Sequence, residues 1–280
     1  MRVWNGTPHE FLIRAAELTR TGIGLPAYYN DEVIIPSLMS RGLTLRDARD
    51  YNIIGCVEPQ KSGKTEGWHD AAFFNMCRPL ELVFSNGMDK GVRIGPATGN
   101  VEDMTTFEQF YDAYKKQMDY AIQLLVNADN AIDMAHAERC PLPFLSSMVD
   151  DCMKVGKTVQ EGGAVYNFTG PQGFGVANMA DSLYSVKTLV YDEKKITMGE
   201  LKEALATNYG KGLGAEDVAA MTAKIANELK EAGKTIGEKE VAAILNTVVA
   251  ASEAPEVKAN GKRILKLIEE VPKFGNDIPE

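Results

Sequence analysis

The sequence predicts a helix-rich α/β fold, and three observations indicate it. Of the 280 residues, 45% are apolar and 25% are charged, which is typical of a water-soluble globular protein with a sizeable core. Two short runs, Tyr51–Val57 and Ala164–Phe168, are rich in the β-branched and aromatic residues that favour strands. Apolar residues at helical spacing occupy most of the remaining chain, so helices should outnumber strands.

The first sixty-odd residues alternate turn signals with short apolar runs. We expect a helix over Phe11–Ala16, a short buried segment over Glu32–Ile35 and a second short helix over Leu43–Asp50. Pro59 follows the first strand-like run and has no amide hydrogen to donate, so it is predicted to end that strand. The polar run Gln60–Gly67 is then a loop.

The central part of the sequence is predicted to hold two long helices. Trp68–Asn86 carries apolar residues at helical spacing, and the glycine-rich loop Gly91–Asn100 separates it from a helix that runs to about Asn130. Thr105–Glu108 matches the capping box that begins such helices. The apolar stripe from Phe107 to Leu125 is predicted to be core.

The last third of the sequence becomes helical and charged. A short helix over Phe144–Met153 precedes the second strand, the glycine run Gly170–Gly175 is predicted to be a tight turn, and a further helix begins near Ala177. Four amphipathic helices are expected after this point, over Met198–Ala206, Ala215–Ala232, Glu238–Ala251 and Ala259–Glu270. We therefore divide the chain into a first part, 1–198, and a helical, charged segment, 199–280, in which residues 210–271 have no assigned role.

Charge and composition exclude several classes of protein. Thirty basic against 39 acidic residues give a net charge of −9, which argues against nucleic acid as a partner. No window approaches the roughly 20 apolar residues that cross a bilayer, and no secretory signal is present, so a cytoplasmic location without membrane binding is expected. The four cysteines and three histidines include neither a Cys-x-x-Cys nor a His-x-x-x-His pair, so we expect no metal site.

The sharpest chemical candidate is a thiol close to a carboxylate. Cys56 and Glu58 stand two residues apart at the end of the first predicted strand, where side chains at that spacing share one face. His69 is the histidine nearest in sequence that could activate a thiol. The same residues also fit a buried structural cysteine followed by a loop glutamate.

Several spaced motifs resemble one known family. They are Asn30-Asp-Glu-Val-Ile-Ile-Pro36, Gly55-Cys-Val-Glu-Pro59, Trp68-His-Asp70, Tyr166-Asn-Phe-Thr-Gly-Pro-Gln-Gly-Phe-Gly175, Asn178-Met-Ala-Asp-Ser182 and Pro272-Lys-Phe-Gly-Asn-Asp277. Together they resemble the glycyl radical enzymes related to pyruvate formate-lyase, and most of all the branch of glycerol and propanediol dehydratases, choline trimethylamine-lyase, hydroxyproline dehydratase and isethionate sulfite-lyase. They span nearly the whole chain.

The resemblance implies radical chemistry and a role for each motif residue. Cys56 would carry a thiyl radical that abstracts hydrogen from a substrate carbon, and Glu58 would act as general base on a substrate hydroxyl. Asp70 stands where the diol dehydratases place a substrate-binding aspartate, and His69 beside it would assist there or simply pack. The pKa of Glu58 is expected to be raised by a dry cavity. The thiol and the carboxylate would lie in a sealed chamber.

The resemblance also implies a fold that this chain does not complete. The family's core is a barrel of ten strands wrapped by helices, and this sequence should supply only its cysteine hairpin and flanking helices. Strand edges and apolar faces would then lie uncovered. The Arg-Val-x-Gly-Tyr motif that bears the glycyl radical is absent, so no cofactor is expected in this chain and the radical is expected on a missing C-terminal segment. The sequence is expected to be a fragment or one subunit of a split enzyme.

Three functional hypotheses follow. The leading one is a glycyl radical lyase or dehydratase that cleaves a C–O, C–N or C–S bond of a small polar substrate, activated by a radical S-adenosylmethionine enzyme and dimeric at full length. The second is C–C cleavage as in formate C-acetyltransferase, which adjacent cysteines mark, whereas Val57 follows Cys56 here. The third is a non-catalytic fragment or subunit that needs a partner chain carrying the radical loop.

Overall fold

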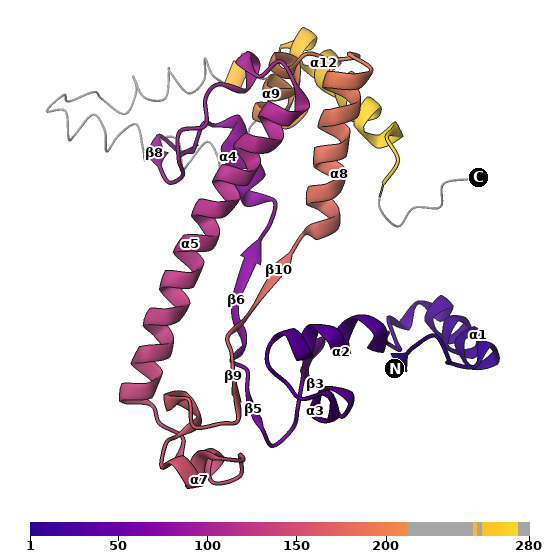
Figure 1. The fold of residues 1–280 in the computed structure, drawn as a ribbon. Coiled ribbons are helices and arrows are strands. Elements are labelled where there is room, and N and C mark those ends of the chain that lie inside the picture. Colours follow the sequence, from indigo (N-terminus) through magenta and orange to yellow (C-terminus); the bar gives the residue numbers. More distant parts are fainter. Residues whose placement is uncertain (212–248, 251–253, 274–280) are drawn as a thin grey trace, which may run out of the picture. The chain divides into compact units, whose positions relative to one another are not determined.

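The computed structural model describes residues 1–211, 249–250 and 254–273, and the chain divides into two compact units (Figure 1). Unit 1 comprises Met1–Phe73 and Leu125–Gln172, and unit 2 comprises Phe74–Leu124 and Gly173–Glu280. The helices predicted over Ala215–Ala232 and Glu238–Ala251 lie outside the described residues, except for two helical positions at 249 and 250. The functional division at residue 198 stays a prediction.

Unit 1 begins with short helices around a small apolar cluster. The N-terminal elements are β1 (Arg2–Val3), α1 (His9–Leu18), a π-helical turn (Thr19–Ile23), β2 (Tyr29–Asn30), α2 (Asp31–Ser40) and α3 (Leu45–Arg49), with β1 parallel to β2. The two predicted helices are confirmed by α1 and α3. The prediction of a short buried segment over Glu32–Ile35 is wrong. These residues lie in the first turns of helix α2, which Asn30 caps, and none of them is buried, because only one side of this helix, with Leu38, faces the apolar cluster. Leu38, Leu43, Ala48 and Tyr51 form the cluster.

The first predicted strand is a hairpin. Strand β3 (Asn52–Ile54) pairs in antiparallel fashion with β4 (Glu58–Gln60), and Ile53 lies opposite Pro59. The prediction that Pro59 ends the ladder is wrong, because both strands of a two-stranded sheet are edges and leave outward positions that need no amide donor. Gly55 turns the chain with a φ of 57°, so residues 55–57 form the hairpin tip.

The prediction of a helix over Trp68–Asn86 is also wrong. Strand β6 (His69–Asn75) occupies its first half, and the helix α4 (Arg78–Phe84) begins only afterwards. Pro79 is the reason, because a proline inside the longer helix would clash with the carbonyl of residue 75, whereas it fits the first turn of α4. The apolar spacing of β6 fitted a helix, but pairing with another strand overrides it.

The glycine run that was predicted to be a tight turn forms strand β10 (Gly170–Phe174) instead. It pairs with β6, and β9 (Tyr166–Asn167), within the second predicted strand, pairs in parallel with β5 (Thr65–Glu66); Figure 1 shows both pairs side by side. A Cβ atom at Gly170 would lie 3.3 Å from the carbonyl oxygen of Gly67. Glycine therefore permits the close approach of the two strands.

The long predicted helix is confirmed as α5 (Phe107–Arg139), which continues beyond Asn130. Its cap lies one residue later than predicted: Thr106 Oγ1 accepts from the Gln109 amide at 3.3 Å, and Gln109 Oε1 accepts from the Thr106 amide at 3.3 Å. The helix over Phe144–Met153 is broken into α6 (Pro143–Ser146) and α7 (Cys152–Val155), because Asp151 adopts a φ of 75°. The smaller elements are β7 (Met88–Asp89), β8 (Val92–Arg93) and 3-10 turns at Val101–Asp103 and Val159–Glu161.

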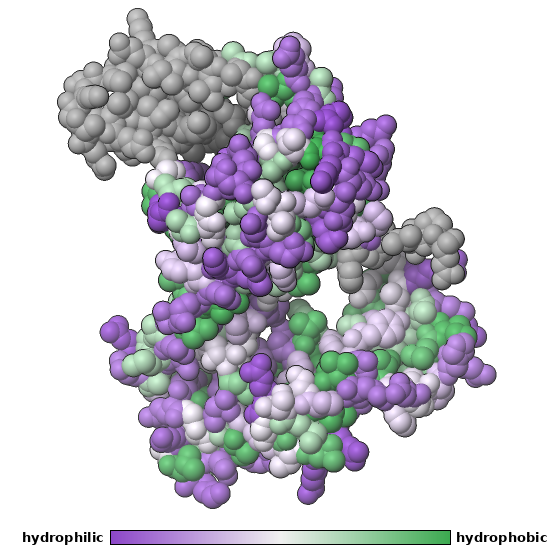
Figure 2. Space-filling view, turned by 45° about the horizontal axis from the view of Figure 1, so that its top comes forward, coloured by the Kyte–Doolittle hydropathy of each residue, from purple (hydrophilic) through white to green (hydrophobic). Residues whose placement is uncertain are grey.

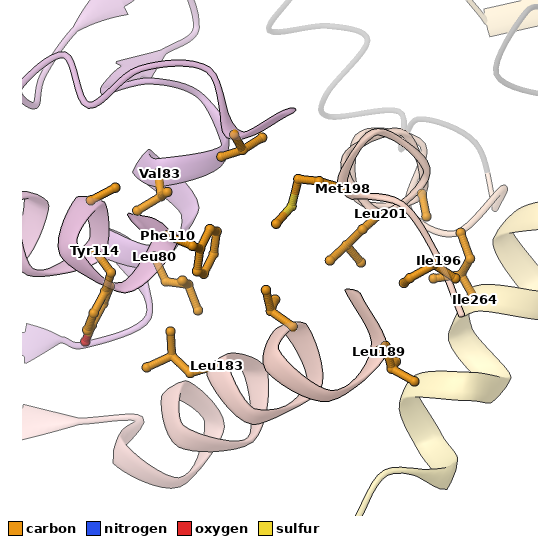
Figure 3. Packing of buried hydrophobic residues seen from close by; sticks show 14 of the residues in the cluster. Leu80, Val83, Phe110, Tyr114, Leu183, Leu189, Ile196, Met198, Leu201 and Ile264 are labelled. Carbon is orange, nitrogen blue, oxygen red and sulfur yellow. The ribbon is translucent and has the colours of Figure 1, made fainter. Parts of the chain in front are cut away.

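Unit 2 is built around an apolar core in which three helices and a π-helical turn meet α4 and α5. Figure 3 shows Phe110 beside Leu80 and Val83, with Leu189 and Ile264 on the other side. A fully buried phenylalanine stabilises a core by about 1.5–3 kcal/mol. The helices are α8 (Val176–Val186), a π-helical turn (Lys187–Asp192), α9 (Met198–Ala206) and α12 (Pro255–Glu270). They confirm the helices predicted near residue 177, over 198–206 and over 259–270, and the core stripe of α5 holds as far as Met118, after which Ile122 is exposed.

The described residues contain five two-stranded sheets and no closed barrel. Apolar side chains reach the surface among polar ones in Figure 2, and Phe144 and Met153 are 80% and 77% exposed. The expected uncovered edges and apolar faces are therefore present. Among these residues, no helix combines the length and apolar character required to cross a bilayer.

Candidate active site

Cys56 lies at the tip of the β3–β4 hairpin. The hydroxyl of Tyr29, from β2, donates a hydrogen bond to the carbonyl oxygen of Cys56 and ties the tip to the first sheet. The thiol is exposed, so the prediction of a sealed chamber is wrong for the residues that the structure describes. The physical reason is that the nearby sheets are only two strands wide and form no wall around the tip.

The carboxylate of Glu58 folds back under this tip. The backbone amide of Val57 donates to Glu58 Oε2 at 3.0 Å, and the side chain is buried. A Cβ atom at Gly55 would lie 3.0 Å from the same oxygen, so glycine leaves the space that the carboxylate fills. The turn, and not the pleat of one extended strand, therefore brings residues 56 and 58 to the same end of the hairpin.

The ionisation of Glu58 differs from the expectation. The Val57 amide lowers the pKa of Glu58 below its ordinary value of 4.5, and this effect outweighs the burial that would raise it. The amide of Cys56 and the charge of His69 lower the same pKa further. The predicted upward shift is wrong because a carboxylate under a turn accepts hydrogen bonds in its charged form.

Asp70 joins Glu58 through a third side chain. The amide nitrogen of Gln172, in β10, donates to Glu58 Oε1 and to Asp70 Oδ1. Asp70 lies in β6, is exposed and has a φ of 59°, and Trp68 two positions earlier has a φ of 39°. Left-handed backbone at non-glycine residues is strained and often marks functional sites.

His69 lies beside this group but faces another partner. Its Nε2 atom is 2.9 Å from Oε1 of the buried Gln60, and its ring meets Phe168 edge-on with centroids 6.4 Å apart. The structure therefore brings Glu58 and Asp70 together, and it places His69 as a residue packed next to them.

Sequence reasoning missed Gln172. The only signal was its place in the glycine-rich run after a strand, and that run was interpreted as a turn. The contacts of Gln172 span 114 and 102 positions, so no local pattern contains them. Tyr29, which holds the carbonyl of Cys56, was missed for the same reason.

This arrangement has a definite chemical capacity. A thiol that is accessible at the hairpin tip can lose its hydrogen atom to a radical, and the sulfur radical that remains can take a hydrogen atom from a ligand carbon. Glu58 and Asp70 together provide several carboxylate oxygens that can accept hydrogen bonds or a proton from ligand hydroxyls. In the described ranges, no group of three or more histidine, cysteine or carboxylate side chains has a metal-binding arrangement.

Comparison with known proteins identifies the family. The family described as "Pyruvate formate lyase-like" matches residues 1–280. A (2S)-3-sulfopropanediol dehydratase from Klebsiella oxytoca is 39% identical over 211 residues, which are 75% of this chain and 26% of that enzyme.

Two solved structures of dehydratases are similar to this chain. One, from a study of 1,2-propanediol dehydration in Roseburia inulinivorans, has a TM-score of 0.88 and 60% identity, and covers 99% of this chain and 33% of its own. The B12-independent glycerol dehydratase from Clostridium butyricum, in its glycerol-bound form, has a TM-score of 0.69 and 62% identity over 79% of this chain and 28% of its own. The chain thus spans a quarter to a third of the length of these relatives. The match over all 280 residues shows that the chain belongs to the pyruvate formate lyase-like family of glycyl radical enzymes.

Proposed function

We propose that these residues form part of a glycyl radical dehydratase or lyase that cleaves a carbon–heteroatom bond of a small polar substrate. The observation that carries the proposal is the convergence of Glu58 and Asp70 on Gln172, next to the hairpin tip that presents Cys56. The relatives named above are dehydratases that act on propanediols or glycerol. The 39–62% identity of this chain to them supports the same type of reaction here.

Each residue has a distinct task in the proposed reaction. The Cys56 sulfur radical takes a hydrogen atom from a substrate carbon, which leaves an S–H bond and a carbon radical. Glu58 accepts the proton of the hydroxyl on that carbon, and the neighbouring C–O, C–N or C–S bond breaks as its leaving group departs. The product radical then takes the hydrogen atom back from the S–H bond, and the sulfur radical is restored.

The charged state of Glu58 suits this task. Because the Val57 amide lowers its pKa, the carboxylate is ionised near pH 7, and only this form can accept a proton. Asp70 accepts a hydrogen bond from a second substrate hydroxyl, and its exposed position leaves it accessible to a ligand. His69 supports the site by packing beside it.

The unpaired electron comes from outside this chain. A glycyl radical on a polypeptide segment beyond these residues would supply it, and the exposed tip leaves Cys56 accessible to such a segment. We further propose that a radical S-adenosylmethionine enzyme installs the radical, that the full-length protein is a homodimer and that it acts in the cytoplasm.

Replacement of the cysteine tests the proposal. In the full-length protein, activated without oxygen, Cys56→Ser should abolish turnover but leave the glycyl radical doublet in the electron paramagnetic resonance spectrum. A serine O–H bond is too strong to relay the hydrogen atom. Cys140→Ser is the matched control, because Cys140 is also an exposed thiol, and it should keep normal turnover. Normal turnover in Cys56→Ser contradicts the proposal.

A further inference from the structure

One amide group is shared between the two carboxylates of the site. The side-chain nitrogen of Gln172 contacts Glu58 Oε1 and Asp70 Oδ1 at once. An amide nitrogen carries two hydrogens, so it can give one to each carboxylate. With the amide turned around, its oxygen would face two anions, so the observed orientation is the favourable one.

We propose that Gln172 is a positioning residue that holds the carboxylates of Glu58 and Asp70 together and fixes the orientation in which Glu58 accepts a proton. This inference rests on the proposed function of the site. It goes beyond that function by giving Gln172 a task of its own in the reaction.

The need for such a residue follows from charge. Two carboxylates that approach a common point repel each other, and each favours protonation of the other. A donor placed between them stabilises both anions without adding a competing charge. Glu58 can then stay ionised while it lies beside Asp70, as a general base requires.

Gln172 is held firmly enough to act in this way. It lies within strand β10, whose Gly170 amide donates to the carbonyl oxygen of Trp68 at 3.3 Å. A Cβ atom at Gly170 would also lie 3.5 Å from Nδ1 of His69, so this glycine sets how closely the strands approach. A side chain on a paired strand keeps a more exact position than one on a loop.

Other groups around Glu58 act on its ionisation as well. The Val57 amide from the hairpin tip and the charge of His69 from β6 lower its pKa. Asp70 from β6 is the other carboxylate that accepts from the Gln172 amide nitrogen. Cys56 lies at the same tip, with its carbonyl bonded by Tyr29. Loss of the Gln172 donor removes one stabilising contact from the anion, so the pKa of Glu58 should rise.

The test uses Gln172→Met in the activated full-length enzyme. Methionine has nearly the length of glutamine but donates no hydrogen bond. We expect kcat/KM to fall by about tenfold or more, since hydrogen bonds to charged groups have effects of that size. The acidic limb of the pH profile of kcat/KM should move to higher pH. Gln172→Glu, which adds a third carboxylate of the same shape, should move the limb further in the same direction.

The control is Gln160→Met, which makes the same chemical change within the same unit. Gln160 Oε1 accepts from the Leu142 amide, away from the two carboxylates, so the acidic limb should not move. The glycyl radical yield and the melting temperature are measured for every variant. If Gln172→Met does not fold, the shift of the acidic limb in Gln172→Glu tests the proposal instead.

The outcomes separate this inference from the proposed function. An unchanged acidic limb in Gln172→Met and Gln172→Glu overturns the positioning role, even if activity falls, because a merely structural effect would not alter ionisation. Turnover by Cys56→Ser would refute the thiyl mechanism independently of Gln172. An inactive Cys56→Ser together with a shifted limb in both Gln172 variants supports both.

Discussion

At the scale of single residues, Glu58 shows that burial alone does not set ionisation. Its side chain is only 8% exposed, which by itself raises the pKa of a carboxyl group. The hydrogen bond from the Val57 amide is the larger effect, and the pKa lies below 4.5. The sequence predicts that Glu58 is a site residue, but it does not predict which backbone amides of the turn donate hydrogen bonds to its carboxylate.

Gly55 provides a residue-scale prediction. Gly55→Ala adds a methyl group 3.0 Å from Glu58 Oε2, at a backbone φ of 57°. We expect a displaced carboxylate and a loss of roughly tenfold or more in kcat/KM, which the kinetics of the activated full-length enzyme would show.

Gly63→Ala is the matched control for that variant. Gly63 also has a left-handed φ, 73°, but nothing lies within 4 Å of its added Cβ atom. Both variants have the same kind of backbone strain, about 1 kcal/mol, and only one meets the carboxylate. Equal losses of activity in the two variants would show that strain, and not contact with Glu58, is responsible.

At the scale of elements, apolar spacing and capping residues predict most helices, but they do not predict which segments pair as strands. The helices α1, α3, α5, α8, α9 and α12 follow from apolar spacing and capping signals in the sequence. Strand β6 does not, because its spacing also suits a helix and only its partner β10 distinguishes the two. Pro79 was a weaker signal, since it disfavours a helix that continues through residue 75, although α2 accommodates Pro36 in its interior.

The cap of α5 gives an element-scale prediction. Thr106→Ala removes the oxygen that accepts from the Gln109 amide and should weaken the first turn of α5 by about 1 kcal/mol. Amide hydrogen exchange over residues 107–110 should then accelerate roughly fivefold. Glu108→Ala, at the position that the sequence pattern favoured, should have a smaller effect. A larger effect of Glu108→Ala than of Thr106→Ala would show that the capping box begins at Thr105, as the sequence pattern predicts.

At the scale of the whole molecule, contacts between distant segments are what the sequence does not predict. Asp47 in α3 bonds Lys64 Nζ at 3.0 Å and the hydroxyl of Tyr166 at 2.7 Å, across 17 and 119 positions. The family motifs pointed to Cys56, Glu58 and Asp70. The residues that hold them in place come from elsewhere in the chain and are visible only once it has folded.

Tyr166 gives the prediction at this scale. Tyr166→Phe removes the hydroxyl that bonds Asp47, and amide exchange over residues 164–168 should accelerate about tenfold. Tyr184→Phe, which changes an exposed tyrosine of α8, is the control and should have no effect there.

The effect should also depend on pH. The hydrogen bond from Tyr166 is the main cause that lowers the pKa of Asp47 below its ordinary value of 3.8. The stabilisation is therefore complete above pH 3.8 and is lost as the pH falls through the lower value of the folded state. The difference between Tyr166→Phe and the unmodified protein should disappear under such acidic conditions. A difference that persists there would assign the effect to packing or to the hydrogen bond that the Thr44 amide donates to the same hydroxyl at 3.3 Å.

The parallel pairing of β5 with β9 determines where the chain can gain or lose residues without disturbing the site. The amides of Tyr166, Phe168 and Gly170 donate in turn to the carbonyls of Lys64, Glu66 and Trp68, at 2.9, 3.0 and 3.3 Å. Side chains alternate along a strand. One residue inserted within 64–68 or within 166–170 would therefore turn the side-chain amide of Gln172 away from the carboxylates of Glu58 and Asp70. Residues gained or lost in the loops between Asn75, where β6 ends, and Tyr166, where β9 begins, leave this register intact, so the chain can change in length there while the side chains of residues 58, 70 and 172 stay together.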